Sequence, residues 1–454
     1  MARALGMLLL LGLAAALAAP ARADDRWKIP TEVRRLPNGL TVVISEDHSA
    51  PLFGLAVSYR IGFRLEPRGR SGFAHLFEHM MFQGTPRVPK GTFERVINSG
   101  GGTLNGFTRP DFTAYISAGP LSALDAVLWL EADRMKGLDL SEATLRNQKD
   151  VVKEEIRVNV KNRPYGLFYS SSVAAKAFDR WENAHDGYGS FEDLEAATLT
   201  DVRAFFDASY GPGNAVLAIV ADLPAAEAFA RVEKAFGSVP SRPAPTVPDL
   251  SEPLNRAERT AIEEDPLARA PAVAIGWKGP AAETRDQAAA AVLGEILAGG
   301  EASRLYQALV KDQQVALEVS GGLNWAAGTP WEYQGPVLFT IFAVHKPGTE
   351  GRAVVASVQA EVERIAREGV SPKELRRARA KVLSDLYAML EMPLFRAASL
   401  SVYQLLFGKA GLVNDLPARL GAVTSSDVAR VAREFLTVPN RTVVERRPAA
   451  AAPR

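Results

Sequence analysis

The sequence repeats its own pattern once, and this repeat limits the folds open to the chain. Three segments align in order with later ones: 77–84 with 293–300 at an offset of 216, 141–156 with 371–386 at 230, and 200–214 with 426–440 at 226. Chance similarity between helices of like composition is the alternative for any one alignment, but three alignments in order with similar offsets argue against it. The offsets are too long for a solenoid and fit a duplicated domain of about 200 residues.

The repeat divides the chain of 454 residues into segments, in keeping with two or three domains by length. Five prolines between residues 238 and 258 mark a linker: Pro240, Pro243, Pro245, Pro248 and Pro253. The predicted division is a signal peptide at 1–23, a first copy at 30–237, the linker at 238–258, a second copy at 259–445 and a tail at 446–454.

Short apolar runs rich in β-branched residues alternate with long helical patterns in both copies. The predicted strands are 40–44, 55–59 and 215–220 in the first copy, and 272–277 and 337–342 in the second. The pattern predicts the α+β class and leaves the order of the strands open.

The segment 72–82 contains the pattern His75-x-x-Glu78-His79 inside an apolar run. On a helix these three residues fall on one arc with Phe82, and the opposite arc is apolar: Phe73, Leu76, Phe77 and Met80. Two imidazoles four residues apart can reach one metal ion at roughly 2.0–2.1 Å. Glu78 lies where it can accept a proton from metal-bound water.

This pattern inverts the commoner His-Glu-x-x-His and is typical of inverzincins. The alternative is a polar stripe on an amphipathic helix. Such a stripe usually holds Lys, Arg or Glu rather than two of the chain's five histidines. The sequence therefore favours a metal site at His75 and His79.

A third ligand is expected from a helix at 141–158, which begins with Ser141 as its cap and which no Gly or Pro interrupts. Its predicted buried face holds Leu145, Gln148, Val151, Val152 and Ile156. Glu155 falls inside this arc, whereas Glu154 points to the far side. A carboxylate directed at the core is protonated, paired with a cation or bound to a metal. A salt bridge to an arginine is the alternative, and Glu155 is the preferred metal ligand.

These residues resemble the pitrilysin family of zinc peptidases, which includes insulin-degrading enzyme and the mitochondrial processing peptidase. His75-x-x-Glu78-His79 is followed, after 75 intervening residues, by Glu155 in a helical Glu-Glu-Ile. Further similar segments lie at 36–42, 84–85, 101–108, 111–115 and 300–306, the last holding Gly-x-x-Ser-Arg-Leu. The resemblance covers nearly all of the chain after residue 23 and is to the short form, like a subunit of the mitochondrial processing peptidase.

The resemblance implies two homologous domains, each a mainly antiparallel sheet packed against helices. It implies a zinc-dependent endopeptidase with one Zn2+ per chain, acting on peptides or unfolded polypeptide segments. It also implies a strand edge at Asn105 and Gly106, where a peptide substrate adds as a further strand. An ordinary turn asparagine is the alternative reading of Asn105.

Two departures from the family pattern matter. Members often carry a second glutamate seven residues before the metal-ligating one, and here Gln148 takes that place as a supporting residue without charge. The spacing from His79 to Glu155 is slightly short, which leaves Glu154 as a minor alternative ligand. The second copy holds Ala291 and Glu295 at the histidine positions and has no metal site.

The resemblance also bears on partners. Short members of the family reach four domains by pairing two chains, so we expect a dimer, with a homologous subunit that lacks zinc or with a second copy. Because the family contains inactive homologues, a non-catalytic partner or scaffold subunit is the alternative function.

The first 23 residues fit a secretory signal peptide: Arg3, an apolar stretch at 4–19, and Ala-Arg-Ala before Asp24. An uncleaved amphipathic anchor is the alternative, but the stretch lacks a polar face. We therefore expect export to the periplasm, and no later stretch spans a membrane.

The composition of the chain argues against nucleic-acid binding and against a zinc site built from cysteines. The net charge is +1, or −1 without the two arginines of the signal peptide. The chain therefore lacks the excess positive charge with which proteins bind nucleic acid. The chain has no cysteine, which leaves His, Glu and Asp as zinc ligands. The segment 184–188, which contains His185, loosely matches a loop near the site in the pitrilysin family. We nevertheless expect His185 in a surface loop, as we do His48 and His345.

Overall fold

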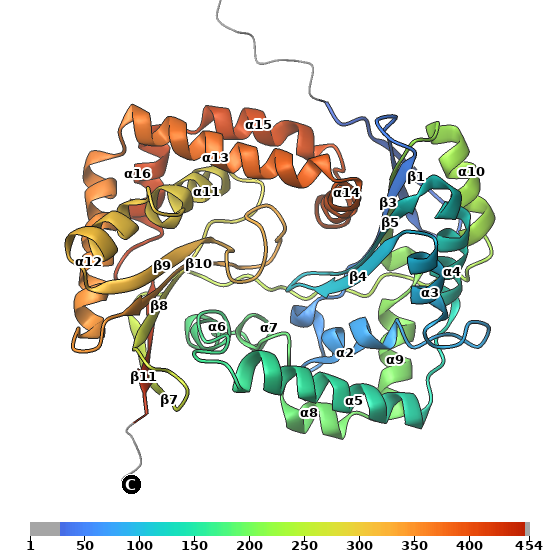
Figure 1. The fold of residues 1–454 in the computed structure, drawn as a ribbon, viewed down its shortest axis with the longest axis horizontal. Coiled ribbons are helices and arrows are strands. Elements are labelled where there is room, and N and C mark those ends of the chain that lie inside the picture. Colours follow the sequence, from blue (N-terminus) through green and yellow to red (C-terminus); the bar gives the residue numbers. More distant parts are fainter. Residues whose placement is uncertain (1–27, 450–454) are drawn as a thin grey trace, which may run out of the picture.

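The computed structural model describes residues 28–449, and these form two halves that face each other (Figure 1). Each half is a sheet with helices packed on it, so the predicted α+β class with two similar domains is confirmed.

The first sheet has six strands in the order β1-β2-β6-β3-β5-β4. Its strands are β1 (Glu32–Arg35), β2 (Thr41–Glu46), β3 (Leu52–Tyr59), β4 (Thr103–Thr108), β5 (Thr113–Pro120) and β6 (Ala215–Ala221). The pair β2–β6 is parallel and every other pair is antiparallel.

The second sheet has five strands in the order β7-β11-β8-β10-β9. Its strands are β7 (Arg259–Asp265), β8 (Ala272–Lys278), β9 (Ala316–Leu323), β10 (Leu338–His345) and β11 (Arg441–Pro448). Again one pair, β7–β11, is parallel. The order matches that of the first sheet without β1, which is the three-dimensional form of the sequence repeat.

Helices occupy most of the remaining chain. The first half has α2 (Phe73–Met80), α3 (Thr92–Ser99), α4 (Leu124–Lys136), α5 (Glu142–Ile156), α6 (Ser171–Ala177), α7 (Trp181–Ala184), α8 (Phe191–Ala196), α9 (Leu199–Ser209) and α10 (Ala225–Phe236). The second has α11 (Arg285–Ala298), α12 (Gly351–Glu368), α13 (Pro372–Glu391), α14 (Pro393–Phe407), α15 (Leu412–Ala422) and α16 (Ser425–Glu434). Among the described residues, five further segments are 3-10 or π helices: Phe63–Leu65, Leu121–Ala123, Arg157–Lys161, Pro212–Asn214 and Tyr306–Asp312.

Equivalent helices begin with equivalent caps. Thr198 and Asp201 form a capping box at the start of α9, and Thr424 and Asp427 form the same box at the start of α16. In each box the threonine hydroxyl accepts the backbone N–H of the aspartate, and the aspartate carboxylate accepts the backbone N–H of the threonine. A local sequence signal therefore sets both helix starts.

Each sheet is covered on one face by a helix from the other half. Helix α14 packs across β3, β6 and β5 of the first sheet, and the short helix α6 packs on β7, β8 and β11 of the second. Figure 1 shows α14 beside β3, and α6 beside β8 on the side of the second sheet that faces the first half. The approach is close: a Cβ at Gly54 of β3 would lie 2.2 Å from the carbonyl of Pro393, and one at Gly276 of β8 would lie 2.5 Å from Val173.

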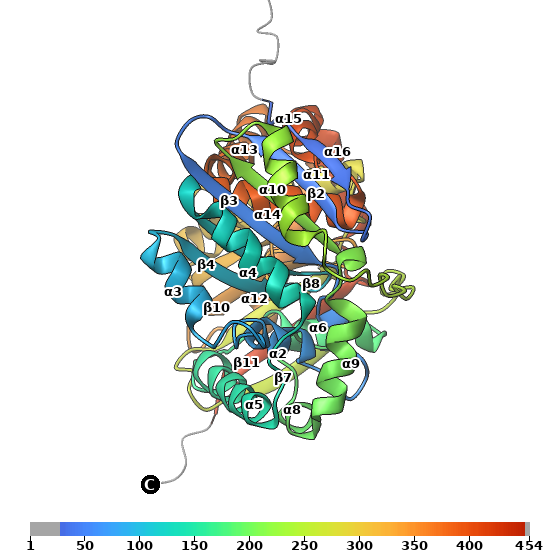
Figure 2. The ribbon, with the colours of Figure 1, turned by 90° about the vertical axis from the view of Figure 1, so that its right-hand side faces the viewer.

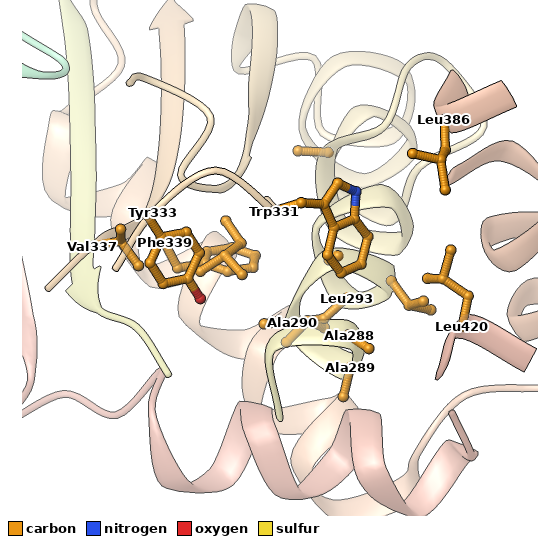
Figure 3. Close-up of a cluster of buried hydrophobic side chains, with 14 of the residues drawn as sticks. Ala288, Ala289, Ala290, Leu293, Trp331, Tyr333, Val337, Phe339, Leu386 and Leu420 are labelled. Carbon is orange, nitrogen blue, oxygen red and sulfur yellow. The ribbon is translucent and has the colours of Figure 1, made fainter. Parts of the chain in front are cut away.

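The inner strands β3, β6, β8 and β10 are apolar on both faces because both faces are covered. On the first sheet Val42, Leu55 and Leu217 point toward α4 and α10, which lie in front of the sheet in Figure 2. The alternate residues Val43 and Ala56 point toward α14 and join the large core of the second half. Figure 3 shows part of that core, where the α11 residues Ala288 and Leu293 pack beside Trp331.

Several expectations are corrected. The tail was expected from residue 446, but Arg446–Pro448 extend β11 and pair with β7. The buried face of α5 is narrower than predicted. Val151 is exposed because α5 contacts its neighbours through the other four predicted residues, Leu145, Gln148, Val152 and Ile156, which are buried. His345 is the last residue of β10 and is buried, not a loop residue.

The expected signal peptide at 1–23 lies outside the described residues. Within residues 28–449, no helix has the length and apolar character needed to cross a membrane. Residues 238–258, expected as a linker, contain no helix or strand.

Candidate metal centre

Helix α2 presents its polar arc to a cavity and its apolar face to the core. Phe73, Leu76, Phe77 and Met80 are buried, as predicted from the helical period. His75, Glu78 and His79 lie on the opposite arc. The N-terminus of the helix has no side-chain cap of its own, and Glu66 supplies one by accepting the backbone N–H groups of Gly72 and Ala74 at 2.9 and 2.7 Å.

Helix α5 crosses α2 and brings Glu155 to the two histidines. Oε2 of Glu155 lies 3.2 Å from Nε2 of His79 and 3.6 Å from Nε2 of His75, and the two Nε2 atoms are 3.3 Å apart. These residues form a group that could hold a metal ion. Glu154 is exposed and pairs with Arg157 at 3.0 Å, away from this group.

The donor set suits zinc. Burial, followed by the neighbouring charge of His79, lowers the pKa of His75 to about 4, so its imidazole is neutral at pH 7, as a metal ligand must be. A hydrogen bond from His79 is the main cause that holds the pKa of Glu155 below its ordinary value. Two imidazoles and one carboxylate whose donor atoms converge are a common ligand set for catalytic zinc.

Glu78 lies beside this group without joining it. The hydroxyl of Thr108, at the end of β4, donates to Oε2 of Glu78 at 2.7 Å. Burial raises the pKa of Glu78 above its ordinary value, with the Thr108 hydrogen bond opposing the shift. A carboxylate with a raised pKa is a better proton acceptor at neutral pH.

The site opens into a cavity of about 400 Å3 between the two halves. His75, Glu78 and Tyr188 line it from the first half. Its opposite wall comes from the second half, from the segment after β9 and from β10, and includes Asn324, Ala327 and Thr340. The two halves therefore enclose the site together.

Two family models match the chain in succession. The model described as "Insulinase (Peptidase family M16)" matches residues 41–180, which include His75, Glu78, His79 and Glu155. The model described as "Peptidase M16 inactive domain" matches residues 196–382. The chain belongs to peptidase family M16. The resemblance to pitrilysin-type peptidases expected from the motifs is confirmed.

Individual proteins and a solved structure are also similar to this chain over most of its length. Zinc protease PqqE of Helicobacter pylori is 27% identical over 417 residues, covering 91% of this chain and 92% of that protein. A probable mitochondrial-processing peptidase subunit beta of Arabidopsis thaliana is 26% identical over 415 residues, covering 89% and 76%. The crystal structure of a protease from Helicobacter pylori matches with a TM-score of 0.86 at 27% identity, covering 92% of this chain and 100% of that one.

The other residues expected at the M16 site lie at different distances from it. Gly106 lines the cavity, and a Cβ there would lie 3.0 Å from Cγ of Glu78. Asn105 is exposed on the edge strand β4, where its Oδ1 accepts the N–H of Gly106 at 2.9 Å. Gln148 is buried on α5, and its amide donates to Asn147 at 2.8 Å.

Sequence reasoning missed residues that surround the M16 site. His185, expected in a surface loop, is largely buried and lies 3.1 Å from Glu66. Tyr188 of the same loop reaches Glu155. The sequence signal was a loose match of this loop to the family pattern, and it carried no indication of burial. His48, by contrast, is exposed as expected.

Proposed function

We propose that this chain is a zinc-dependent endopeptidase that hydrolyses peptides or unfolded polypeptide segments. One zinc ion per chain would be held by Nε2 of His75, Nε2 of His79 and Oε2 of Glu155. The convergence of these three atoms beside the buried carboxylate of Glu78 is the observation that supports the proposal. Relatives named zinc proteases support it independently.

The residues of the site would divide the chemistry between them. Zinc, when bound, supplies Lewis acidity toward water and the scissile carbonyl. Glu78 accepts the proton of the attacking water and later delivers it to the departing amine. Thr108 orients the Glu78 carboxylate by its hydrogen bond.

A substrate would bind as a strand against β4. This strand is at the edge of the first sheet, so one side of its backbone is free to pair. A peptide added there passes Glu78, because Gly106 of β4 packs directly over Cγ of that residue. Backbone pairing of this kind favours extended, unfolded segments over folded ones. Asn105 and Gly106 are the proposed contacts.

The second copy would have no catalytic site. Ala291 and Glu295 replace the histidines there, and the inactive-domain model matches only residues 196–382. A purely non-catalytic scaffold would not need His75, Glu78, His79 and Glu155 in one place. The complete set in the first half therefore favours the enzyme over the scaffold.

We further propose that the chain acts in the periplasm and as part of a dimer. The composition of residues 1–23 supports export. The cavity is partly open, so a second chain, either a homologous subunit without zinc or another copy, would complete the exclusion of water. One relative is named a subunit, which supports pairing.

Metal analysis of the purified chain, combined with cleavage of an unstructured peptide library, tests the function. We expect close to one zinc ion per chain and metal-dependent cleavage. His79→Ala removes one of three ligands and should lose the ion. Full zinc content in that variant, or no zinc in the wild type, would refute the assignment.

A further inference from the structure

The two carboxylate oxygens of Glu155 face different partners. Oε2 faces Nε2 of His75 and Nε2 of His79, as described above. Oε1 faces away from the histidines, toward the hydroxyl of Tyr188 at 3.3 Å and Nδ2 of Asn159 at 3.4 Å. One oxygen is thus directed at the metal position and the other is held by two donors.

Tyr188 contacts a second ligand as well. Its ring lies edge-on to the imidazole of His75, with centroids 5.0 Å apart and planes at 84°. It comes from the loop between α7 and α8, far along the chain from both ligand helices. A single side chain therefore touches one ligand of α2 and one of α5.

The loop that carries Tyr188 is internally fixed. Oδ1 of Asp186 accepts the backbone N–H groups of Tyr188 and Gly189 at 2.9 and 3.0 Å. Such an Asx turn holds the backbone at the residue that projects into the site.

The same loop is bound to the residues just before α2. The N–H of Ser190 donates to the hydroxyl of Ser71 at 3.1 Å, and the N–H of Ser71 donates to Asp193 at 2.9 Å. The loop and the start of the ligand helix therefore form one hydrogen-bonded unit.

His185 fastens the other end of this loop. Nδ1 of His185 lies 2.8 Å from the carbonyl of Trp181, and Nε2 lies 3.1 Å from Oε2 of Glu66. The carbonyl can only accept. Glu66 in turn accepts two backbone N–H groups of α2. The pair of His185 and Glu66 therefore ties the loop to the N-terminus of α2.

We infer that Tyr188 is a positioning residue of the metal centre: its hydroxyl, with Asn159, holds Oε1 of Glu155 so that Oε2 is presented to the ion. The inference rests on the proposed zinc site. A carboxylate without such partners rotates freely, and ordering it on binding costs free energy. Groups that orient a metal ligand in this way typically contribute 10- to 100-fold to metal affinity.

Tyr188→Phe tests this, because it removes the hydroxyl and keeps the ring against His75. We expect the zinc dissociation constant, measured by competition with a chromophoric chelator, to rise on the order of 10-fold. The matched control is Tyr306→Phe in the second half, whose hydroxyl also faces a glutamate, Glu301, at 3.5 Å. The control should bind zinc as the wild type does.

Two further measurements separate positioning from loss of fold. Thermal unfolding of the zinc-free proteins should be the same for Tyr188→Phe and the wild type. In the cobalt-substituted proteins, the visible absorption bands should differ, because the carboxylate geometry changes. Asn159→Ala combined with Tyr188→Phe should weaken zinc binding beyond either change alone.

The outcomes are distinct for the two proposals. If Tyr188→Phe binds zinc with wild-type affinity and shows an unchanged cobalt spectrum, the positioning role is wrong, whatever happens to peptide cleavage. If the wild-type protein itself binds no zinc, the proposed function fails and this inference fails with it.

Discussion

At the scale of single residues, Glu78 is set apart from the three residues that converge at the metal position. It does not join the group and is held by Thr108. We expect Glu78→Gln to keep the zinc ion and the fold, and to reduce peptide cleavage by a factor on the order of 10² or more, since a proton acceptor is lost. Steady-state cleavage assays together with metal analysis check this. Loss of zinc from the variant would contradict the division of roles.

The adjacent glutamates of α5 provide an internal comparison. Glu155 faces the histidines, and Glu154 is exposed beside Arg157. Glu155→Gln should therefore weaken zinc binding measurably, whereas Glu154→Gln should change zinc binding and cleavage little, because exposed ion pairs contribute about 0–1 kcal/mol. Chelator titrations of the two variants, carried out in parallel, measure this difference in zinc binding. An exchange of the two phenotypes would mean that the ligand is Glu154.

At the scale of elements, α14 and α6 each pack closely on the sheet of the other half. A Cβ at Gly54 would lie 2.2 Å from the carbonyl of Pro393 at the start of α14. Gly54→Ala should lower the free energy of unfolding by about 1–3 kcal/mol, the usual cost of overpacking. Chemical denaturation measures it.

Gly421→Ala is the matched control, because Gly421 lies in α15 with open space around its Cα. There the change should be neutral or stabilising by up to about 1 kcal/mol, as alanine favours a helix over glycine. Equal effects at both positions would show that α14 does not pack on β3 as described.

A second element-scale prediction concerns the segment 300–306, which resembles the family pattern. Arg304 of this segment donates to Glu374 near the start of α13 at 2.7 and 3.1 Å. The hydrogen bond from Arg304 is the main cause that lowers the pKa of Glu374 from 4.5 to about 2. The pattern thus has a structural role, joining α13 to the turn after α11.

The pH dependence follows from the sign of that shift. Because the folded pKa lies below the unfolded one, the stabilisation is fully present above pH 4.5 and is lost as the pH falls toward 2. Glu374→Gln should cost about 2 kcal/mol at pH 7, allowing for partial exposure. Denaturant unfolding should show a smaller difference in the free energy of unfolding between Glu374→Gln and the wild type at pH 3 than at pH 7. An equal difference at both pH values would mean that the charge of Glu374 is not its source.

At the scale of the whole molecule, the site is enclosed on two sides by one chain. The first half supplies the candidate metal centre, and the second half supplies the opposite wall through Asn324, Ala327 and Thr340. The cavity remains partly open. We expect the purified chain to form a dimer or to associate with a homologous subunit that lacks the histidines, and to cleave peptides slowly when alone.

Light scattering with and without a co-expressed homologue tests this expectation. Association should raise the mass to that of two chains and raise the rate of cleavage, because exclusion of water strengthens the electrostatics of the site. A monomer that cleaves peptides at its full rate would contradict it.

The sequence by itself determined what depends on local spacing. The period of α2 separates His75 and His79 from the apolar face, and helix caps such as that of Ser141 mark helix starts. The duplication and the α+β class also follow from the order of local patterns. These features need only neighbours along the chain, so a single sequence contains them.

Only the tertiary structure decided which distant segments meet. The strand order, the covering of each sheet by a helix of the other half, and the exposure of Val151 depend on contacts between residues far apart. The same is true of His185 and Tyr188, whose loop is ordinary in composition but lies against α2. Burial and hydrogen bonding of such residues are set by packing, which local spacing does not encode.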